Sequence, residues 1–192
     1  IKMIKEKTTV FLTVGNKKQK VLCEKLLSTM SEIRFLDIRV VSDDDYEHRL
    51  GSGGAVLNIL RRYYQSGQKM IIINSGGMSK RSINYAVRSK AFASVPYNEE
   101  TISLLEFILK NSEKIVSSVS SGVLICCSDI VVRTDDFDFL LTDNTGICVK
   151  SDFSTASNHG VMVCDDKFRM TDYLHKKDPS YLEGIARELC LD

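Results

Sequence analysis

The apolar run Met70-Ile71-Ile72-Ile73 constrains the fold more than any other feature of this chain. Consecutive residues of a strand point to opposite faces of a sheet, so this run would be buried on both faces. Such strands are typical of parallel sheets, whose connecting helices cover the two faces. The run therefore predicts an α/β protein with a central parallel strand at residues 69–74.

The segments before this run alternate between strand and helix patterns. Residues 8–14 are apolar and β-branched, which predicts a buried strand, and residues 35–41 predict a second one. Residues 17–30 carry apolar side chains on one helical face, and residues 55–64 show a second helical pattern. The order β-α-β-α-β predicts a Rossmann-like, doubly wound, mostly parallel sheet.

The second half of the chain predicts a change of architecture. A helix is expected to run to about Val116, with Asn98 or Thr101 as its N-cap. A long strand is expected over residues 122–132, interrupted at Ser128-Asp129. Shorter strands with polar turns are expected at residues 147–150, 161–164 and 169–175, as antiparallel additions to the sheet. A closing helix is expected at residues 179–189. We expect residues 1–192 to form a single domain.

Composition excludes some classes of function. Lysine and arginine total 26 against 25 aspartates and glutamates, whereas a general nucleic-acid binder needs a basic surplus. No apolar run approaches the roughly 18 residues that span a bilayer, so no membrane partner is expected. The 6 cysteines lack CxxC spacing, which favours reduced, mostly buried thiols and a cytoplasmic setting.

Two glycine-rich segments, each after a predicted strand, carry the first functional signal: Gly51-Ser52-Gly53-Gly54 and Ser75-Gly76-Gly77. Open α/β sheets bind ligands at the carboxyl ends of their strands, where both segments would converge. Glycine lets backbone N–H groups approach phosphate oxygens closely, and a helix beginning at Ala55 would add its positive end. The alternative for either segment is a plain tight turn.

Familiar nucleotide-binding motifs do not match these segments. A Rossmann fingerprint needs glycine where Val56 stands, and neither segment contains the Gly-Lys-Ser or Gly-Lys-Thr of a Walker A loop. The chain also lacks the HRD and DFG sequences of a protein kinase and the GxSxG elbow of a serine hydrolase. A small-molecule kinase is therefore the less favoured enzyme class.

Charged residues near the glycine segments suggest chemistry on phosphates. Arg81 follows the second segment, and Lys90 lies a few residues further on. Such cations can neutralise a triphosphate and the charge that develops during phosphoryl or nucleotidyl transfer. Asp129 ends an apolar strand, where Mg²⁺ would be a suitable partner. The alternatives are solvated cations and a turn or capping aspartate, and His159 is interpreted as a turn residue.

Several motifs, taken in order, resemble the L-fucose-1-phosphate guanylyltransferase (GDP-fucose pyrophosphorylase) family, which includes bifunctional fucokinase/pyrophosphorylases. The likeness covers most of the chain. It is carried by Arg49-Leu50-Gly51-Ser52-Gly53-Gly54-Ala55, Gly76-Gly77-Met78-Ser79-Lys80-Arg81, Lys90-Ala91-Phe92-Ala93-Ser94-Val95-Pro96, Cys127-Ser128-Asp129, Asn158-His159-Gly160-Val161 and Asp172-Tyr173-Leu174-His175-Lys176-Lys177.

The resemblance implies a nucleotidyltransferase fold and transfer of GMP from GTP to a sugar 1-phosphate, L-fucose 1-phosphate in this family. It implies that Arg81 contacts the departing phosphates, that Lys90 contacts the phosphate near the reacting centre, and that Asp129 holds Mg²⁺. The nucleotide would lie against Gly51, Ser52, Gly53, Gly54, Gly76 and Gly77. In the family, glycine usually precedes the aspartate, where this chain has Ser128.

Family members are much longer than this chain and carry further segments for the sugar. We therefore expect residues 1–192 to be a truncated part of a longer chain. The alternative function is a nucleotide-binding module without catalysis, which lacks the part that receives the sugar.

Overall fold

The chain folds into two compact units, residues 1–141 and residues 142–192. The structure, a computed structural model, describes residues 8–34, 36–44, 50–75, 89–130, 132, 141 and 143–188. The first unit contains a parallel sheet with helices and a short hairpin, and the second contains a hairpin with two helices. The expectation of one domain over residues 1–192 stays a prediction.

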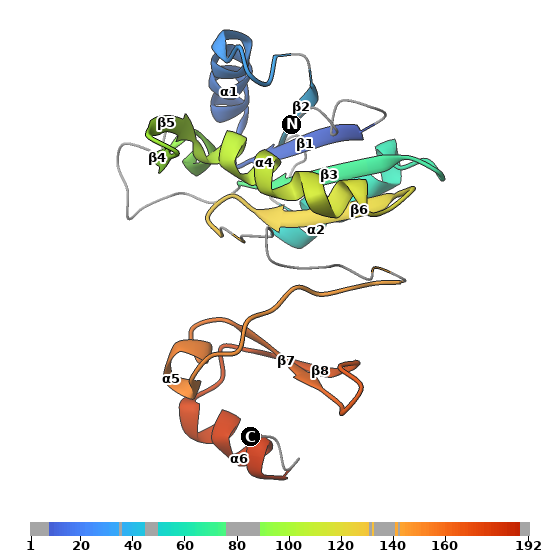
Figure 1. Cartoon of the computed structure of the whole chain (residues 1–192), viewed down its shortest axis with the longest axis vertical. Helices are drawn as coiled ribbons and strands as arrows, with labels where there is room; N and C mark the ends of the chain where they lie inside the picture. Colours follow the sequence, from blue (N-terminus) through green and yellow to red (C-terminus); the bar gives the residue numbers. More distant parts are fainter. Residues whose placement is uncertain are drawn as a thin grey trace. The chain divides into compact units, whose positions relative to one another are not determined.

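The sheet of the first unit has four parallel strands in the order β2-β1-β3-β6 (Figure 1). These strands are β1 (Thr8–Val14), β2 (Asp37–Ser42), β3 (Lys69–Asn74) and β6 (Gly122–Cys127). The predicted parallel sheet and its central apolar strand are confirmed. The chain passes outward from β1 to β2 and then back to β3, so its direction of winding reverses between β1 and β3.

Helices cover both faces of this sheet, which confirms the doubly wound architecture. Helices α1 (Lys17–Thr29) and α4 (Leu104–Ser117) lie on one face, and α2 (Gly51–Tyr63) lies on the other (Figure 1). Along β3, Ile71 and Ile73 pack in the cluster shared with α1 and α4, whereas Ile72 packs in the cluster shared with α2. All three are fully buried, and each stabilises the fold by about 1.5–3 kcal/mol.

The start of α2 corrects the sequence expectation. We expected a loop of glycines before a helix from residue 55, but the helix begins at Gly51, so the glycines form its first turn. The Asp43 carboxylate explains the earlier start, because it accepts hydrogen bonds from the N–H groups of Leu50 and Gly51, at 3.0 and 3.3 Å. The first turn of a helix has amides without intrahelical partners, and an aspartate oxygen satisfies them.

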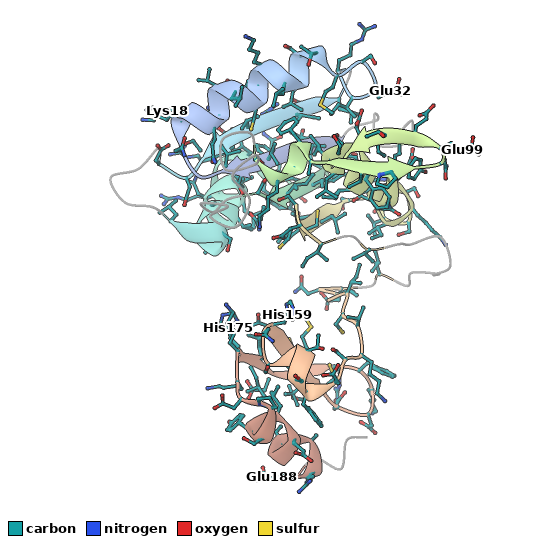
Figure 2. All side chains as sticks on the ribbon, turned by 90° about the vertical axis from the view of Figure 1, so that its left-hand side faces the viewer. Lys18, Glu32, Glu99, His159, His175 and Glu188 are labelled. Atoms are coloured by element: carbon teal, nitrogen blue, oxygen red, sulfur yellow. The ribbon has the colours of Figure 1, made fainter. Side chains whose placement is uncertain are left out.

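A hairpin before α4 was not expected from the sequence. Strands β4 (Ser94–Tyr97) and β5 (Glu100–Ser103) pair antiparallel, and Glu99 lies at the turn between them (Figure 2). Asn98 and Glu99 adopt left-handed backbone angles, with φ of 46° and 67°, as tight hairpin turns require. Asn98 and Thr101 therefore belong to the hairpin, and predicting either as the helix cap was wrong.

Ser103 caps α4 instead. Its hydroxyl accepts a hydrogen bond from the N–H of Glu106 at 3.1 Å, and the Glu106 carboxylate accepts one from the N–H of Ser103 at 2.7 Å. This reciprocal pair is a capping box, in which each side chain satisfies an amide of the helix start. The Ser-x-x-Glu spacing was the sequence signal that could have located this helix start.

The second unit packs an antiparallel hairpin against helices. It contains α5 (Phe153–Ala156), β7 (Gly160–Cys164), β8 (Met170–His175) and α6 (Pro179–Glu188). The core of this unit is formed by Val163, Leu174 and Leu182. His159 and His175 lie at the same end of the hairpin, where Gly160 pairs with His175 (Figure 2). The antiparallel additions and the closing helix are confirmed.

The short strand expected at residues 147–150 does not form. Apolar character alone predicted it, but Ile147 is 42% exposed and Val149 is 85% exposed. A strand needs a hydrogen-bonded neighbour, and within the described residues this segment pairs with none.

Candidate functional site

The carboxyl ends of the four strands lie level with one another. Val14 pairs with Ser42, and Asn74 pairs with both Thr13 and Cys127. The segments that follow the strands therefore leave the sheet along a single edge. In open α/β sheets this edge, at the point where the winding reverses, is where ligands bind.

Two of the predicted site residues meet at this edge. Lys90 Nζ lies 2.9 Å from Asp129 Oδ2, although the two residues are 39 positions apart. Lys90 begins the short helix η1 (Lys90–Phe92), and Asp129 lies just beyond β6. The side chains are 41% and 53% exposed, so this ion pair contributes only about 0–1 kcal/mol to stability. Both groups remain accessible to a ligand.

The turn that carries Asp129 is attached to the sheet through its neighbour. Strand β6 ends at Cys127, and the N–H of the buried Ser128 donates to the Asn74 carbonyl at 2.9 Å. Asp129 therefore follows the strand, whereas the sequence predicted an interruption of a longer strand. This position matters for function, because a residue just beyond a strand end lies at the edge where open α/β sheets bind ligands.

The first glycine segment is constrained by structure at two of its glycines. Gly51 has φ of +70°, a left-handed angle that L side chains rarely adopt. A Cβ atom added at Gly54 would lie 2.7 Å from Leu50 Cβ, closer than real Cβ atoms approach. A Cβ added at Gly53 would meet none of the described atoms within 4 Å. Gly51, Ser52 and Gly53 are exposed, so their backbone can be reached from solvent.

Asp43 is a residue of this edge that sequence reasoning missed. It follows β2, and its carboxylate holds the start of α2 across seven positions of the chain. An N-cap side chain normally sits directly before its helix, so no local pattern pointed to Asp43. Its two hydrogen bonds take the amides of Leu50 and Gly51. The Gly51 amide, which was expected to face a phosphate, is therefore already used within the protein.

The cysteines at this end of β6 are poor nucleophiles. Burial, followed by the neighbouring Cys127, raises the pKa of Cys126 to about 12. The pKa of Cys127 is also raised, first by burial and then by the negative charge of Asp129. The described cysteines, Cys23, Cys126, Cys127, Cys148 and Cys164, form no disulfide with one another. Only Cys23 among them is buried and Cys148 is exposed, so the expectation of mostly buried thiols was wrong for this part of the chain.

Asp129 is the predicted metal ligand at this edge. Within the described residues, no group of three histidine, cysteine, aspartate or glutamate side chains could hold a metal. Mg²⁺ in nucleotide sites is commonly held by one or two carboxylates together with phosphate oxygens. Asp129 fits such a site as a partial ligand set that a bound nucleotide would complete.

The remaining predicted site residues, Gly76, Gly77 and Arg81, lie outside the described residues. Lys90 and Asp129 are therefore the predicted pair that the structure brings together. In the described part of the chain, no helix is long and apolar enough to cross a membrane.

The sheet order, the helices on both faces and the paired hairpins are those of an α/β protein of the nucleotidyltransferase type. Comparison with known proteins identifies the family. Residues 66–186 match the fucose pyrophosphorylase domain, and the chain belongs to that family.

Two curated relatives carry the same name. The chain is 27% identical over 168 residues to the fucose-1-phosphate guanylyltransferase of Mus musculus. This alignment covers 80% of the chain and 28% of the relative. It is 26% identical over 172 residues to the fucose-1-phosphate guanylyltransferase of Homo sapiens, covering 81% of this chain and 28% of the relative. The chain thus spans less than a third of these relatives, and no solved structure matches it.

Proposed function

We propose that this chain forms the nucleotide-handling part of a sugar-1-phosphate guanylyltransferase. The enzyme would move GMP from GTP to a sugar 1-phosphate, L-fucose 1-phosphate, and release pyrophosphate. The observation that carries the proposal is the Lys90–Asp129 pair at the carboxyl edge of a parallel sheet, in a chain of the fucose pyrophosphorylase family. The names of the two relatives support the choice of guanylyl transfer and of fucose 1-phosphate.

The proposed reaction is an in-line displacement. A phosphate oxygen of the sugar 1-phosphate attacks the α-phosphorus of GTP, and the bond from that phosphorus to the oxygen of the β-phosphate breaks. The electron pair leaves with pyrophosphate, so atoms and charge balance without a covalent enzyme intermediate. The protein contributes by positioning the two substrates and by stabilising negative charge on the phosphates.

The residues have distinct proposed roles. Lys90 would contact the phosphate at the reacting centre, and Arg81 would contact the departing phosphates. Asp129 would hold Mg²⁺, which supplies charge neutralisation on the phosphate oxygens when bound. The exposed backbone of the first glycine segment would lie along the nucleotide, together with Gly76 and Gly77. We also propose a cytoplasmic setting, which the free cysteines support.

A second candidate function is nucleotide binding without catalysis. It rests on the same Lys90–Asp129 pair, whose accessible charges suit phosphate binding with or without turnover. In that case the same edge would hold a nucleotide, and the part that receives the sugar phosphate would lie elsewhere.

The deciding experiment combines binding with product analysis. Titration calorimetry measures the affinity for each nucleoside triphosphate, and a pyrophosphate-release assay then screens those that bind against a panel of sugar 1-phosphates. The full-length gene product and the 192-residue chain are both tested. GTP-dependent pyrophosphate release with fucose 1-phosphate supports the enzyme. Binding without turnover in the full-length product supports the module, and release of a nucleoside diphosphate would indicate a kinase.

A further inference from the structure

A buried pair of serine hydroxyl groups includes Ser89, the residue directly before Lys90. Ser75 directly follows β3, and its Oγ forms a short hydrogen bond with Ser89 Oγ. Ser75 is 6% exposed and Ser89 is 1% exposed, so water does not compete for this bond. A buried hydroxyl without a partner would be costly, and each hydroxyl here satisfies the other.

Ser89 is held in a backbone conformation that serine rarely adopts. Its φ is +69°, in the left-handed region that favours glycine. Such a conformation costs of order 1–3 kcal/mol and persists only where the surroundings determine it, often at functional sites. Ser89 Oγ also accepts a hydrogen bond from the N–H of Ala91 at 3.3 Å. The side chain thus fixes both its own backbone and the start of η1.

The other end of the Ser75–Ser89 pair is attached to the centre of the sheet. The N–H of Ser75 donates to the backbone carbonyl of Thr13 at 3.2 Å and lies 3.3 Å from Thr13 Oγ1. Thr13 Oγ1 in turn donates to Asn74 Oδ1 at 3.2 Å. Thr13 and Asn74 belong to β1 and β3, the two central strands of the sheet, whose apolar side chains are buried. The serine pair therefore connects η1 to the buried centre of the sheet.

Lys90 is partly exposed, although the residues on either side of it are buried. Ser89 and Ala91 are buried, with Ala91 fully enclosed in the core cluster shared with α1 and α4, whereas Lys90 between them is 41% exposed. From between these two buried neighbours, Lys90 Nζ extends to Asp129 Oδ2 at 2.9 Å. We propose that Ser75 and Ser89 are positioning residues that hold Lys90 against Asp129, a role that rests on the proposed function of that pair.

The test uses the reactivity of the Lys90 amine in the 192-residue chain, which requires no enzyme activity. The chain is exposed to a limiting amount of an acetylating reagent, and the peptide that carries Lys90 is quantified by mass spectrometry. Asp129→Asn defines the rate of an unpaired Lys90. Ser89→Gly is the main variant, because glycine accepts the left-handed φ while the side chain and its hydroxyl are lost. Ser75→Ala removes the partner hydroxyl.

Both serine variants are expected to raise the acetylation rate of Lys90 by about two- to fivefold, toward the rate in Asp129→Asn. A change of this size corresponds to the free energy of an exposed ion pair. Lys69, whose Nζ donates to the Val116 carbonyl at the other end of β3, serves as the internal control for general loosening. Ser112→Ala removes a buried hydroxyl from α4 and should leave Lys90 unchanged. An unchanged Lys90 rate in both serine variants, or an equal rise at Lys69, would overturn the proposal.

A kinetic cycle in the full-length protein separates positioning from stability. If Ser89 acts through Lys90, Ser89→Gly lowers kcat when Lys90 is present. The same substitution then has no further effect on kcat in a protein that already carries Lys90→Met. Independent, multiplicative losses in the double variant would contradict the proposal. If the wild type releases no pyrophosphate, the proposed function fails, while the acetylation result still decides whether the serine pair positions Lys90.

Discussion

Lys90 and Asp129 form an ion pair of 2.9 Å between two segments that are 39 positions apart, each anchored to the end of β3. Ser89 holds the lysine segment through Ser75, and Ser128 holds the aspartate segment through the Asn74 carbonyl. A cation and a carboxylate are thus kept adjacent at the edge where ligands bind. Because both side chains are half-exposed, separating the pair costs little free energy.

Lys90→Ala is expected to lower pyrophosphate release in the full-length protein by about 100- to 1000-fold, the loss typical of removing one charge-stabilising donor. Lys25→Ala is a matched control, because Lys25 is an exposed lysine on α1. Steady-state kinetics with GTP and fucose 1-phosphate measure both variants. Wild-type turnover in Lys90→Ala would remove Lys90 from the proposed mechanism.

Asp129→Asn is expected to change stability and activity to very different degrees. The free energy of unfolding should change by less than about 1 kcal/mol, because the pair is solvent-screened. Turnover should fall sharply, and the concentration of Mg²⁺ needed for half-maximal activity should rise, because a carboxylate ligand has been lost. Urea denaturation and a magnesium titration measure the two effects. An unchanged magnesium requirement would argue against Asp129 as a ligand.

The two glycines Gly53 and Gly54 are expected to respond oppositely to alanine. Gly54→Ala brings a Cβ within 2.7 Å of Leu50 Cβ and should destabilise the start of α2. Gly53→Ala has room among the described residues and should stabilise the helix by about 0.5–1 kcal/mol, because alanine is the better helix former.

Chemical denaturation of the two variants, followed by GTP titration, separates structure from binding. If the backbone at Gly53 lies along the nucleotide, Gly53→Ala should weaken GTP binding while the fold is as stable as before or more so. Unaltered GTP affinity in that variant would leave the first glycine segment with a structural role alone.

Ser103→Ala is expected to lower the free energy of unfolding by about 1 kcal/mol, because it removes the N-cap of α4 and half of the capping box. Ser117→Ala is the control, since Ser117 lies at the far end of the same helix and donates only to the Lys114 carbonyl. Denaturant unfolding measured by circular dichroism should separate the two variants. Equal losses would show that the capping box contributes no special stability.

Cysteine alkylation provides a pH-dependent check of the core. Burial raises the pKa of Cys23 and of Cys126 to about 12, so both thiols stay protonated and unreactive at pH 8 in the folded protein. The exposed Cys148 should react first with iodoacetamide. Because the folded-state pKa values are raised, unfolding lowers them, and denaturant should make Cys23 and Cys126 reactive at the same pH. Rapid alkylation of the folded protein at Cys126 would contradict the packing of β6.

Local sequence patterns predicted those helices and strands whose boundaries follow from the spacing of apolar residues within one segment. Strand β3 and helix α6 were predicted from periodicity within one residue of their observed ends, because apolar spacing directly reflects which face an element buries. The hairpin β4–β5 was missed, because its positive-φ turn at Asn98 and Glu99 lacks the glycine that normally marks such turns.

The sequence by itself determined that a parallel, doubly wound sheet would form, and the family motifs named Lys90 and Asp129 as site residues. Only the tertiary structure decided that these two side chains pair, that the Asp43 carboxylate caps the start of α2, and that Ser75 and Ser89 form a hydrogen bond. The physical reason is that such contacts depend on strand order and on which loops share one edge of the sheet. Those relationships join residues far apart in the chain and leave no periodic signal in either segment.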